Sequence, residues 1–106
     1  MKAWYERIVE AHLKVTEAVS HGQRMKSERY FVWQEDGRDD FYADNTHAEI
    51  VVTGETDLFT KVEFDPWAKE LETALNEAGI SWELVGVELE EDSGFWHHSW
   101  DWRVLD

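Results

Sequence analysis

The stretch that most constrains this fold is ISWELVGVELEEDSGFWHHSWDWRV, residues 80–104, which holds four of the chain's seven tryptophans. Apolar and polar residues mix on both sides of Asp92-Ser93-Gly94, and a glycine there suits the left-handed position of a three-residue hairpin loop. The pattern predicts two antiparallel strands joined by a tight turn. Because a slip of one residue would exchange the two faces, the loop length also predicts a register.

In that register Glu88 lies opposite His98, and Gly86 lies opposite Trp100, where the absent side chain leaves room for the indole. One face at the base of the hairpin is then expected to be core, and its members are Trp82, Leu84, Trp100, Trp102 and Val104. The tip is left for function, and it is crowded by Phe95, His97 and His98.

Two helices are predicted from apolar residues at spacings of three and four. The first covers residues 3–20 and is ended by Gly22. The second has Asp65 as its N-cap, Pro66 at its first position and Gly79 just past its end.

The remaining segments are typical of strands. Aromatic and β-branched residues predict a strand over residues 28–34, with a turn at Asp36-Gly37 and a returning strand over residues 40–43. Residues 46–62 form either one long strand with a bulge or bend at Gly54, or two short strands. The expected fold is a single α+β domain over all 106 residues, in the order α-β-β-β-α-β-β, with a mostly antiparallel sheet and both helices on one face.

The charge is high and uneven. The net charge is −14, but residues 1–30 carry a balance of +2 and residues 31–106 a balance of −16. Such a chain is poorly suited to bind nucleic acid or an anionic membrane over its surface. Two interpretations stay open: a solvated acidic surface, or docking of copies or of a basic partner, positive end to negative end.

Composition limits the chemistry further. The chain has no cysteine, which excludes disulfides and thiolate chemistry and fits a reducing compartment. It shows no apolar leader and no segment near the length of a membrane span, so we expect an unexported, water-soluble protein.

The histidines do not predict a metal site. Adjacent residues on a strand point to opposite faces, so His97 and His98 cannot readily share one ion. Glu88 opposite His98 is a half-site at most, and His47 stands among acids without ligand spacing. The acidic turns also lack the spacing of a calcium-binding loop. We expect no metal and no cofactor.

A catalytic set is not predicted either. Ser99, His98 and Asp101 can be named as a triad, but near-neighbours on one strand do not converge. We therefore expect no enzyme activity and no catalytic residue.

An alternative function rests on aromatic side chains. Exposed rings can stack on sugars or bases, which would make the chain a small ligand- or carbohydrate-binding module. The candidates for such a patch are Trp96, Phe95 and Trp33.

A resemblance to a known family covers residues 28–104. YFVWQEDGRDDFYADNTHAE, TGETDLFTKVEFDP and NEAGISWELVGVELEEDSGFWHHSWDW follow one another along the chain. Together they resemble small tail-completion or tail-terminator proteins, encoded among the head–tail joining genes of long-tailed bacteriophages and prophages. The first helix matches this group in kind more than in letters.

The resemblance implies a non-enzymatic virion assembly protein. Such proteins cap the tail tube as a ring, often of six subunits, and join it to the head connector or stopper, so DNA passing through the lumen would be a passive contact. The implied location is the virion neck, after assembly in the bacterial cytoplasm. The contact candidates lie in the 35–47 region and at the hairpin tip: Asp36, Arg38, Asp39, Asp40, Asn45, His47, Glu90, Glu91, Phe95, Trp96 and His98.

Overall fold

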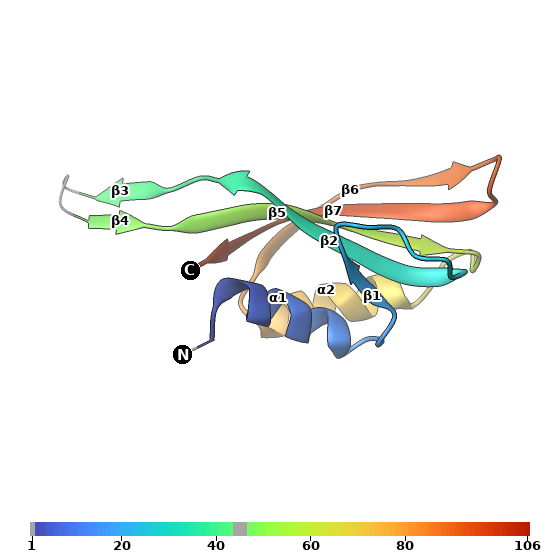
Figure 1. Ribbon diagram of the computed structural model, residues 1–106, viewed down its shortest axis with the longest axis horizontal. Coiled ribbons are helices and arrows are strands. Elements are labelled where there is room, and N and C mark those ends of the chain that lie inside the picture. Colours follow the sequence, from blue (N-terminus) through green and yellow to red (C-terminus); the bar gives the residue numbers. More distant parts are fainter. Residues whose placement is uncertain (1, 44–46) are drawn as a thin grey trace.

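The computed structural model describes residues 2–43 and 47–106, with side chains described outside residues 41–48. Its elements, shown in Figure 1, are α1 (Trp4–Leu13), β1 (Val19–His21), β2 (Arg29–Arg38), β3 (Phe41–Ala43), β4 (His47–Glu49), β5 (Val51–Thr60), α2 (Trp67–Glu77), β6 (Ser81–Glu90) and β7 (Phe95–Leu105).

Five strands form one sheet in the order β1-β2-β5-β7-β6. Only the β1–β2 pair is parallel, and β3 and β4 form a separate two-stranded ribbon that continues the β2–β5 pair outward (Figure 1). Both helices lie on one face of the sheet, which leaves the other face without a helical layer (Figure 1). The predicted α+β class, the run of strands between two helices and the C-terminal hairpin are confirmed, although the described residues between the helices form five strands where three were predicted.

The first helix is shorter than predicted. It ends at Leu13, and Val19–His21 forms β1 instead of a last helical turn. The Ala18 carbonyl accepts the amide of Phe31 in β2, and β-branched residues in this segment favour such pairing over helix. Gly22, expected to cap the helix, follows β1 and donates its N–H to the Trp33 carbonyl.

The predicted turn at Asp36-Gly37 is wrong, because β2 continues through it to Arg38. A bulge between Glu35 and Gly37 absorbs the extra residue, and Gly37 still pairs with Thr53 of β5. Residues 41–43 do form a strand, β3, but it pairs with β4 and does not return along β2. Residues 47–60 form two strands, β4 and β5, but they are separated at Ile50, and β5 runs through Gly54 without interruption.

The register predicted for the C-terminal hairpin is also wrong. Glu90 pairs with Phe95, so the loop has four residues, closed by a 2.7 Å hydrogen bond from the Gly94 amide to the Glu90 carbonyl. A bulge between Leu84 and Gly86 shifts the pairing once more. As a result His98 faces Val87, not Glu88, and Gly86 faces Ser99, not Trp100.

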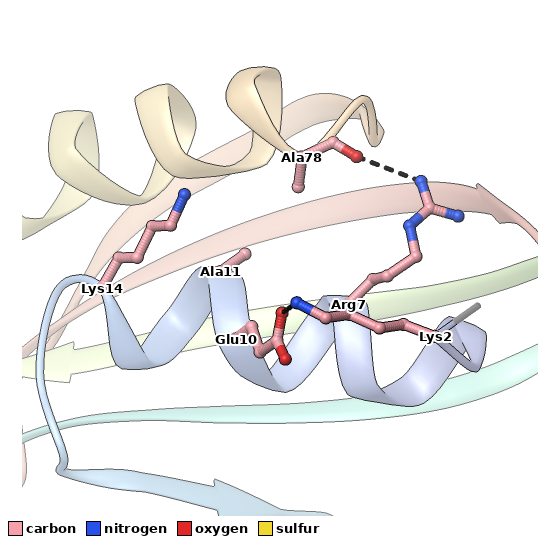
Figure 2. A pocket seen from close by; sticks show the side chains of 6 residues that line it. All are labelled: Lys2, Arg7, Glu10, Ala11, Lys14 and Ala78. Atoms are coloured by element: carbon pink, nitrogen blue, oxygen red, sulfur yellow. Dashed lines mark hydrogen bonds and ion pairs between the residues drawn. The ribbon is translucent and has the colours of Figure 1, made fainter.

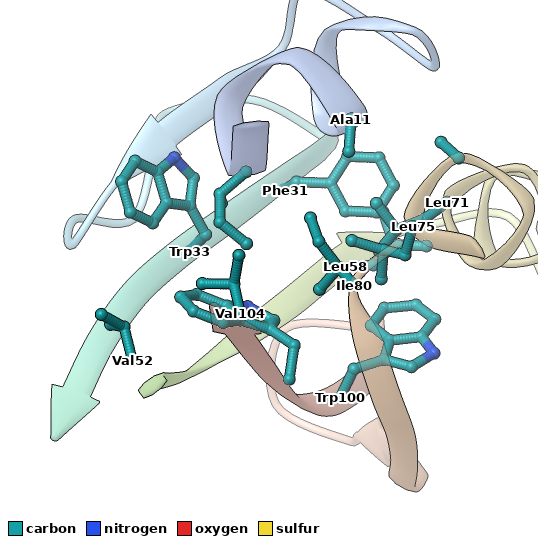
Figure 3. Close-up of a cluster of buried hydrophobic side chains, with 13 residues drawn as sticks. Ala11, Phe31, Trp33, Val52, Leu58, Leu71, Leu75, Ile80, Trp100 and Val104 are labelled. Carbon is teal, nitrogen blue, oxygen red and sulfur yellow. The ribbon is translucent and has the colours of Figure 1, made fainter. Parts of the chain in front are cut away.

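The glycine that makes room for an indole is Gly54, on β5. It lies opposite Trp102, and a Cβ at Gly54 would stand 2.3 Å from Cη2 of that ring and 2.5 Å from the Gln34 carbonyl oxygen. Trp102 is 1% exposed within the core between sheet and helices. Figure 3 shows this core, which includes Ile8, Ala11, Phe31, Trp33, Val52, Leu58, Leu71, Ala74, Leu75, Ile80, Trp100, Trp102 and Val104. The predicted core member Leu84 is instead 44% exposed.

A buried chain of hydrogen bonds ties α1 to the sheet under this core. Trp102 Nε1 donates to Thr56 Oγ1 at 3.0 Å, and Thr56 Oγ1 lies 2.9 Å from His12 Nε2. His12 Nδ1 lies 2.7 Å from the Ile8 carbonyl, which can only accept, so the proton sits on Nδ1 and the Thr56 hydroxyl donates to Nε2. Burial lowers the pKa of His12 to about 4, although the hydrogen bond to Ile8 opposes the shift.

Replacing Gly54 by alanine should destabilise the fold by about 3 kcal/mol or more, because the ring of Trp102 and the backbone of β2 leave no space for a methyl group. Gly86→Ala is the matched control, since a Cβ there meets nothing within 4 Å, and it should change stability by less than about 1 kcal/mol. Urea denaturation of both variants tests this; similar losses at the two positions would contradict the packing described for Trp102.

The buried His12 should make stability depend on pH. Between its ordinary pKa of 6.5 and the folded value of about 4, the unfolded chain binds a proton that the folded chain excludes. The contribution of neutral His12 to the free energy of unfolding is therefore complete above pH 6.5. As the pH is lowered from 6.5 towards 4, the free energy of unfolding decreases by about 1.4 kcal/mol per pH unit for one such group. His12→Asn should remove this part of the slope in urea denaturation at several pH values. An unchanged slope would mean that His12 takes up its proton alike in both states.

Candidate functional site

Most of the predicted contact residues that the structure describes fall into two groups at opposite ends of the sheet. β5 and β7 are antiparallel, so Phe95 and the hairpin tip lie beside the end of β5, while Asp36 lies beside its beginning. Figure 1 shows the two ends far apart along the longest axis. Both groups were predicted to lie at turns, but the structure does not bring them together into one site.

At the hairpin tip the rings of Phe59 and Phe95 are covered by cationic side chains. The guanidinium of Arg24 lies 3.9 Å from the centre of the Phe59 ring and bonds Glu90, and Lys61 lies 4.2 Å from the Phe95 ring. Phe95 also packs edge-on against Tyr30. Phe95 is thus half-buried within its own chain, Glu90 is paired, and Glu91 is exposed in the turn.

At the other end the charged residues are engaged in hydrogen bonds and ion pairs within the chain. Asp36 accepts a 2.7 Å hydrogen bond from Thr53, and Asp39 pairs with Arg103 at 2.6 Å. Arg38 binds Asp40, and its hydrogen bond holds the pKa of that carboxyl below its ordinary value. Asn45 and the side chain of His47 lie outside the described residues.

His97 and His98 point to opposite faces, as the alternation of a strand predicts. His98 is buried on the helix side, where burial lowers its pKa and its Nε2 atom has no hydrogen-bond partner. The other face carries His97, whose Nε2 lies 2.7 Å from Asp57 Oδ1. Residues 2–43 and 47–106 contain no group of three or more His, Cys, Asp or Glu side chains arranged to hold a metal ion.

Ser99, His97 and Asp57 meet on the uncovered face, but their geometry is not that of a hydrolase. Ser99 Oγ and Asp57 Oδ1 lie 3.3 and 2.7 Å from the same ring nitrogen, Nε2 of His97. In a catalytic triad the acid holds one nitrogen and the serine uses the other. The hydroxyl of Ser99 also donates to Asp57 at 2.9 Å, so its proton points to the carboxylate and not to the imidazole. We interpret the three residues as a cross-strand hydrogen-bonded cluster.

The aromatic patch considered from the sequence does not form. Trp33 is only 5% exposed, stacked on His21 and edge-on to Trp4. Trp96 is half-buried and lies in the register of the helix side, whereas Phe95 lies on the uncovered face. The sequence interpretation missed this because it assigned β2 no partner on its outer edge, where His21 of β1 covers the ring.

A depression of about 310 Å³ beside the helices is lined by three cations, Lys2, Arg7 and Lys14 (Figure 2). Its cations are occupied: Lys2 binds Glu10 at 2.6 Å, and Lys14 lies 3.6 Å from Glu77. Arg7 donates to the carbonyls of Ala78 and Leu105, and so ties α1 to the end of α2 and to β7. The depression is therefore a seam that holds the helices together rather than a built anion site.

The uncovered face of the sheet is acidic at its middle. Glu55, Asp101 and Glu83 lie directly opposite one another on β5, β7 and β6. Like charges in such positions repel. Burial raises the pKa of Glu55, and the neighbouring carboxylates of Asp57, Asp36 and Asp101 add to the shift.

Two apolar features escaped the sequence interpretation. On β6 four aliphatic side chains are 42–61% exposed, namely Leu84, Val85, Val87 and Leu89. In the connection from β5 to α2, Phe64 is 89% exposed and has a φ of +55°, a conformation that costs a bulky residue energy. The exposed side chains of β6 could have been noticed in the sequence as the aliphatic run of residues 84–89. The conformation of Phe64 has no sequence signal, since the connection contains no glycine.

A buried ion pair holds the strained connection in place. The side chain of Asp65 is 0% exposed and accepts two hydrogen bonds from Arg29, at 2.5 and 2.8 Å, and one from Thr60. It also accepts the Trp67 amide at 2.9 Å, so it supports the start of α2 much as predicted, although the helix begins one residue later than Pro66. Burial alone would raise the pKa of Asp65, but the bonds from Arg29, Trp67 and Thr60 outweigh it and leave the pKa below its ordinary value.

A chain of a solved structure described as the virion of a native gene transfer agent (GTA) particle is similar to this chain over nearly the full length. The TM-score is 0.56 at 17% sequence identity, and the match covers 97% of this chain and 90% of the other. At this identity the likeness shows the fold. No family model and no curated protein matches the sequence. In the described residues no helix has the length and apolarity to cross a membrane.

Phe64 should be replaceable with a gain in stability. Asparagine adopts the left-handed region more readily than phenylalanine, and the exposed ring gives up little burial, so Phe64→Asn should raise the free energy of unfolding by up to about 1 kcal/mol. Phe64→Ala is the matched control, because it removes the ring without relieving the backbone and should bring no such gain. Thermal and urea denaturation measure both; a clear loss in Phe64→Asn would show that the ring packs within the fold.

Proposed function

We propose that this chain is a non-enzymatic virion assembly protein that caps the tail tube and joins it to the head connector, as a ring of copies. The observation that carries the proposal is the likeness to a chain of a GTA virion over 97% of this chain and 90% of the other. Because the match spans nearly all of both chains, it concerns the whole domain and not a shared motif.

The residues that resemble tail-completion proteins support the same conclusion. The QEDG segment lies on β2 beside the bulge, and the EEDSG segment forms the hairpin turn. Both stand at ends of the sheet, where a small protein can contact a partner above and a partner below. In this proposal the two groups of charged residues face the tube and the connector.

The acidic residues on the face without helices support only passive contact with DNA. The row of Glu55, Asp101 and Glu83 would repel a nucleic acid backbone rather than hold it. A ring that turned this face to its lumen would let DNA pass without adhesion.

The alternative, a ligand- or carbohydrate-binding module, has weaker support. Trp33 is covered by His21 and Trp4, and Phe95 is packed beneath Lys61. A stacking platform needs open ring faces, and these two rings have none to offer.

Deletion of the gene from a particle-producing strain tests the proposal. We expect DNA-filled heads and separate tails, because the joint between them would be missing, and supply of the chain from a plasmid should restore joined particles. Electron microscopy counts both forms. The chain should also be found in purified particles, at the head–tail joint, by antibody labelling. Normal joined particles from the deletion strain would exclude this role.

A further inference from the structure

β6 is an edge strand that exposes aliphatic side chains on one face and glutamates on the other. Eight of its ten residues are exposed, and its only neighbour in the sheet is β7. Leu84, Val87 and Leu89 lie opposite Trp100, His98 and Trp96. Directly paired residues share a face, so the three aliphatic side chains lie on the helix side of the sheet. We call them the β6 stripe.

The helices leave the β6 stripe uncovered. α2 reaches β6 near its start, where Trp82 donates to Asn76 at 2.8 Å. Beyond that point the stripe residues are 42–50% exposed. Exposed edges usually carry charge or bulges that prevent pairing with another chain. The bulge at Val85 protects only the middle of β6, and residues 86–90 remain a regular strand paired with β7.

We infer that β6 pairs with the β1 edge of a second copy of this chain, so that the sheets of neighbouring copies continue into one another. This inference rests on the proposed function and adds the interface by which its ring would form. A contact between two different edges is heterologous, and such contacts close into rings or extend into filaments.

Charge selects this partner edge over a second β6. Residues 81–94 contain five acidic residues and no Lys or Arg, so two β6 edges would bring ten acidic residues together. The other edge is β1, and residues 15–23 around it contain a single acidic residue, Glu17. Pairing β6 with β1 therefore avoids the repulsion that two β6 edges would meet.

The same arrangement covers the β6 stripe. If the sheet continues with its helices on the same side, the helix next to β1 in the neighbouring copy comes under the stripe. That helix is α1, which packs under β2 through Trp4 on Trp33 and leaves Tyr5 and Leu13 50% and 48% exposed. Apolar surface on one copy would thus meet apolar surface on the next.

Engineered cysteines test the inference, since the chain has none of its own. Val87→Cys marks the β6 stripe, and His21→Cys marks the helix side of β1, because His21 pairs with Trp33 of the core. The two single variants, first shown to fold by circular dichroism, are mixed at millimolar concentration and treated with a short bismaleimide. We expect a dimer of the two variants, in about tenfold excess over a control mixture, because bound neighbours react at high effective concentration. The control pairs Val87→Cys with Leu105→Cys, which is 54% exposed and lies at the other end of β7.

Each outcome decides the inference. A dimer of Val87→Cys with itself, formed equally well, would show that β6 meets β6 and would overturn the heterologous pairing. A yield no higher than in the control mixture would overturn the interface altogether. Because the experiment uses the isolated chain, it separates the two proposals: crosslinking without a defect in the deletion strain keeps the interface and removes the virion role, and the reverse keeps the role and removes the interface.

Discussion

The contact between Trp102 and Gly54 is the constraint on which the rest of the structure depends. The indole can lie on β5 only because Gly54 has no side chain, and in that position its N–H reaches Thr56. Thr56 in turn bonds His12, and His12 fixes α1 against the sheet. The positions of α1, β5 and β7, which are distant in sequence, thus depend on the absence of a side chain at Gly54. Each side-chain polar atom in the hydrogen bonds that link these elements has a partner.

The reasoning that a glycine makes room for a tryptophan was sound, but the sequence suggested Gly86, and the structure uses Gly54. The error came from the hairpin register. A loop of four residues and a bulge at Val85 each shift the pairing, and neither leaves a mark in the pattern of apolar residues. The fold class survived because it depends on the type of each element. The pairing of particular residues depends on loop geometry, which the pattern does not carry.

The exposure of the candidate residues was predicted correctly only where charge or turn residues mark them. Asp36, Asp39 and Glu91 are exposed as expected, but most of the predicted contact residues are engaged within the chain, as Phe95 is by Arg24 and Lys61. Of the β6 stripe only Leu84 was predicted to be core, because apolar residues on a strand predict burial unless the helical layer stops short. Phe64 could not be foreseen, since its φ of +55° lies in a connection without a glycine to mark it.

The ion pair of Arg29 and Asp65 has a consequence for the evolution of the chain. Loss of either partner leaves the other without its counter-charge, and for Asp65 that means an unpaired carboxylate in the interior, which is strongly destabilising. Single substitutions at either position are therefore barriers, and the pair is free to change only together. Related sequences should either keep both residues or have replaced both, and the connection that holds Phe64 outward should change its conformation in the same step.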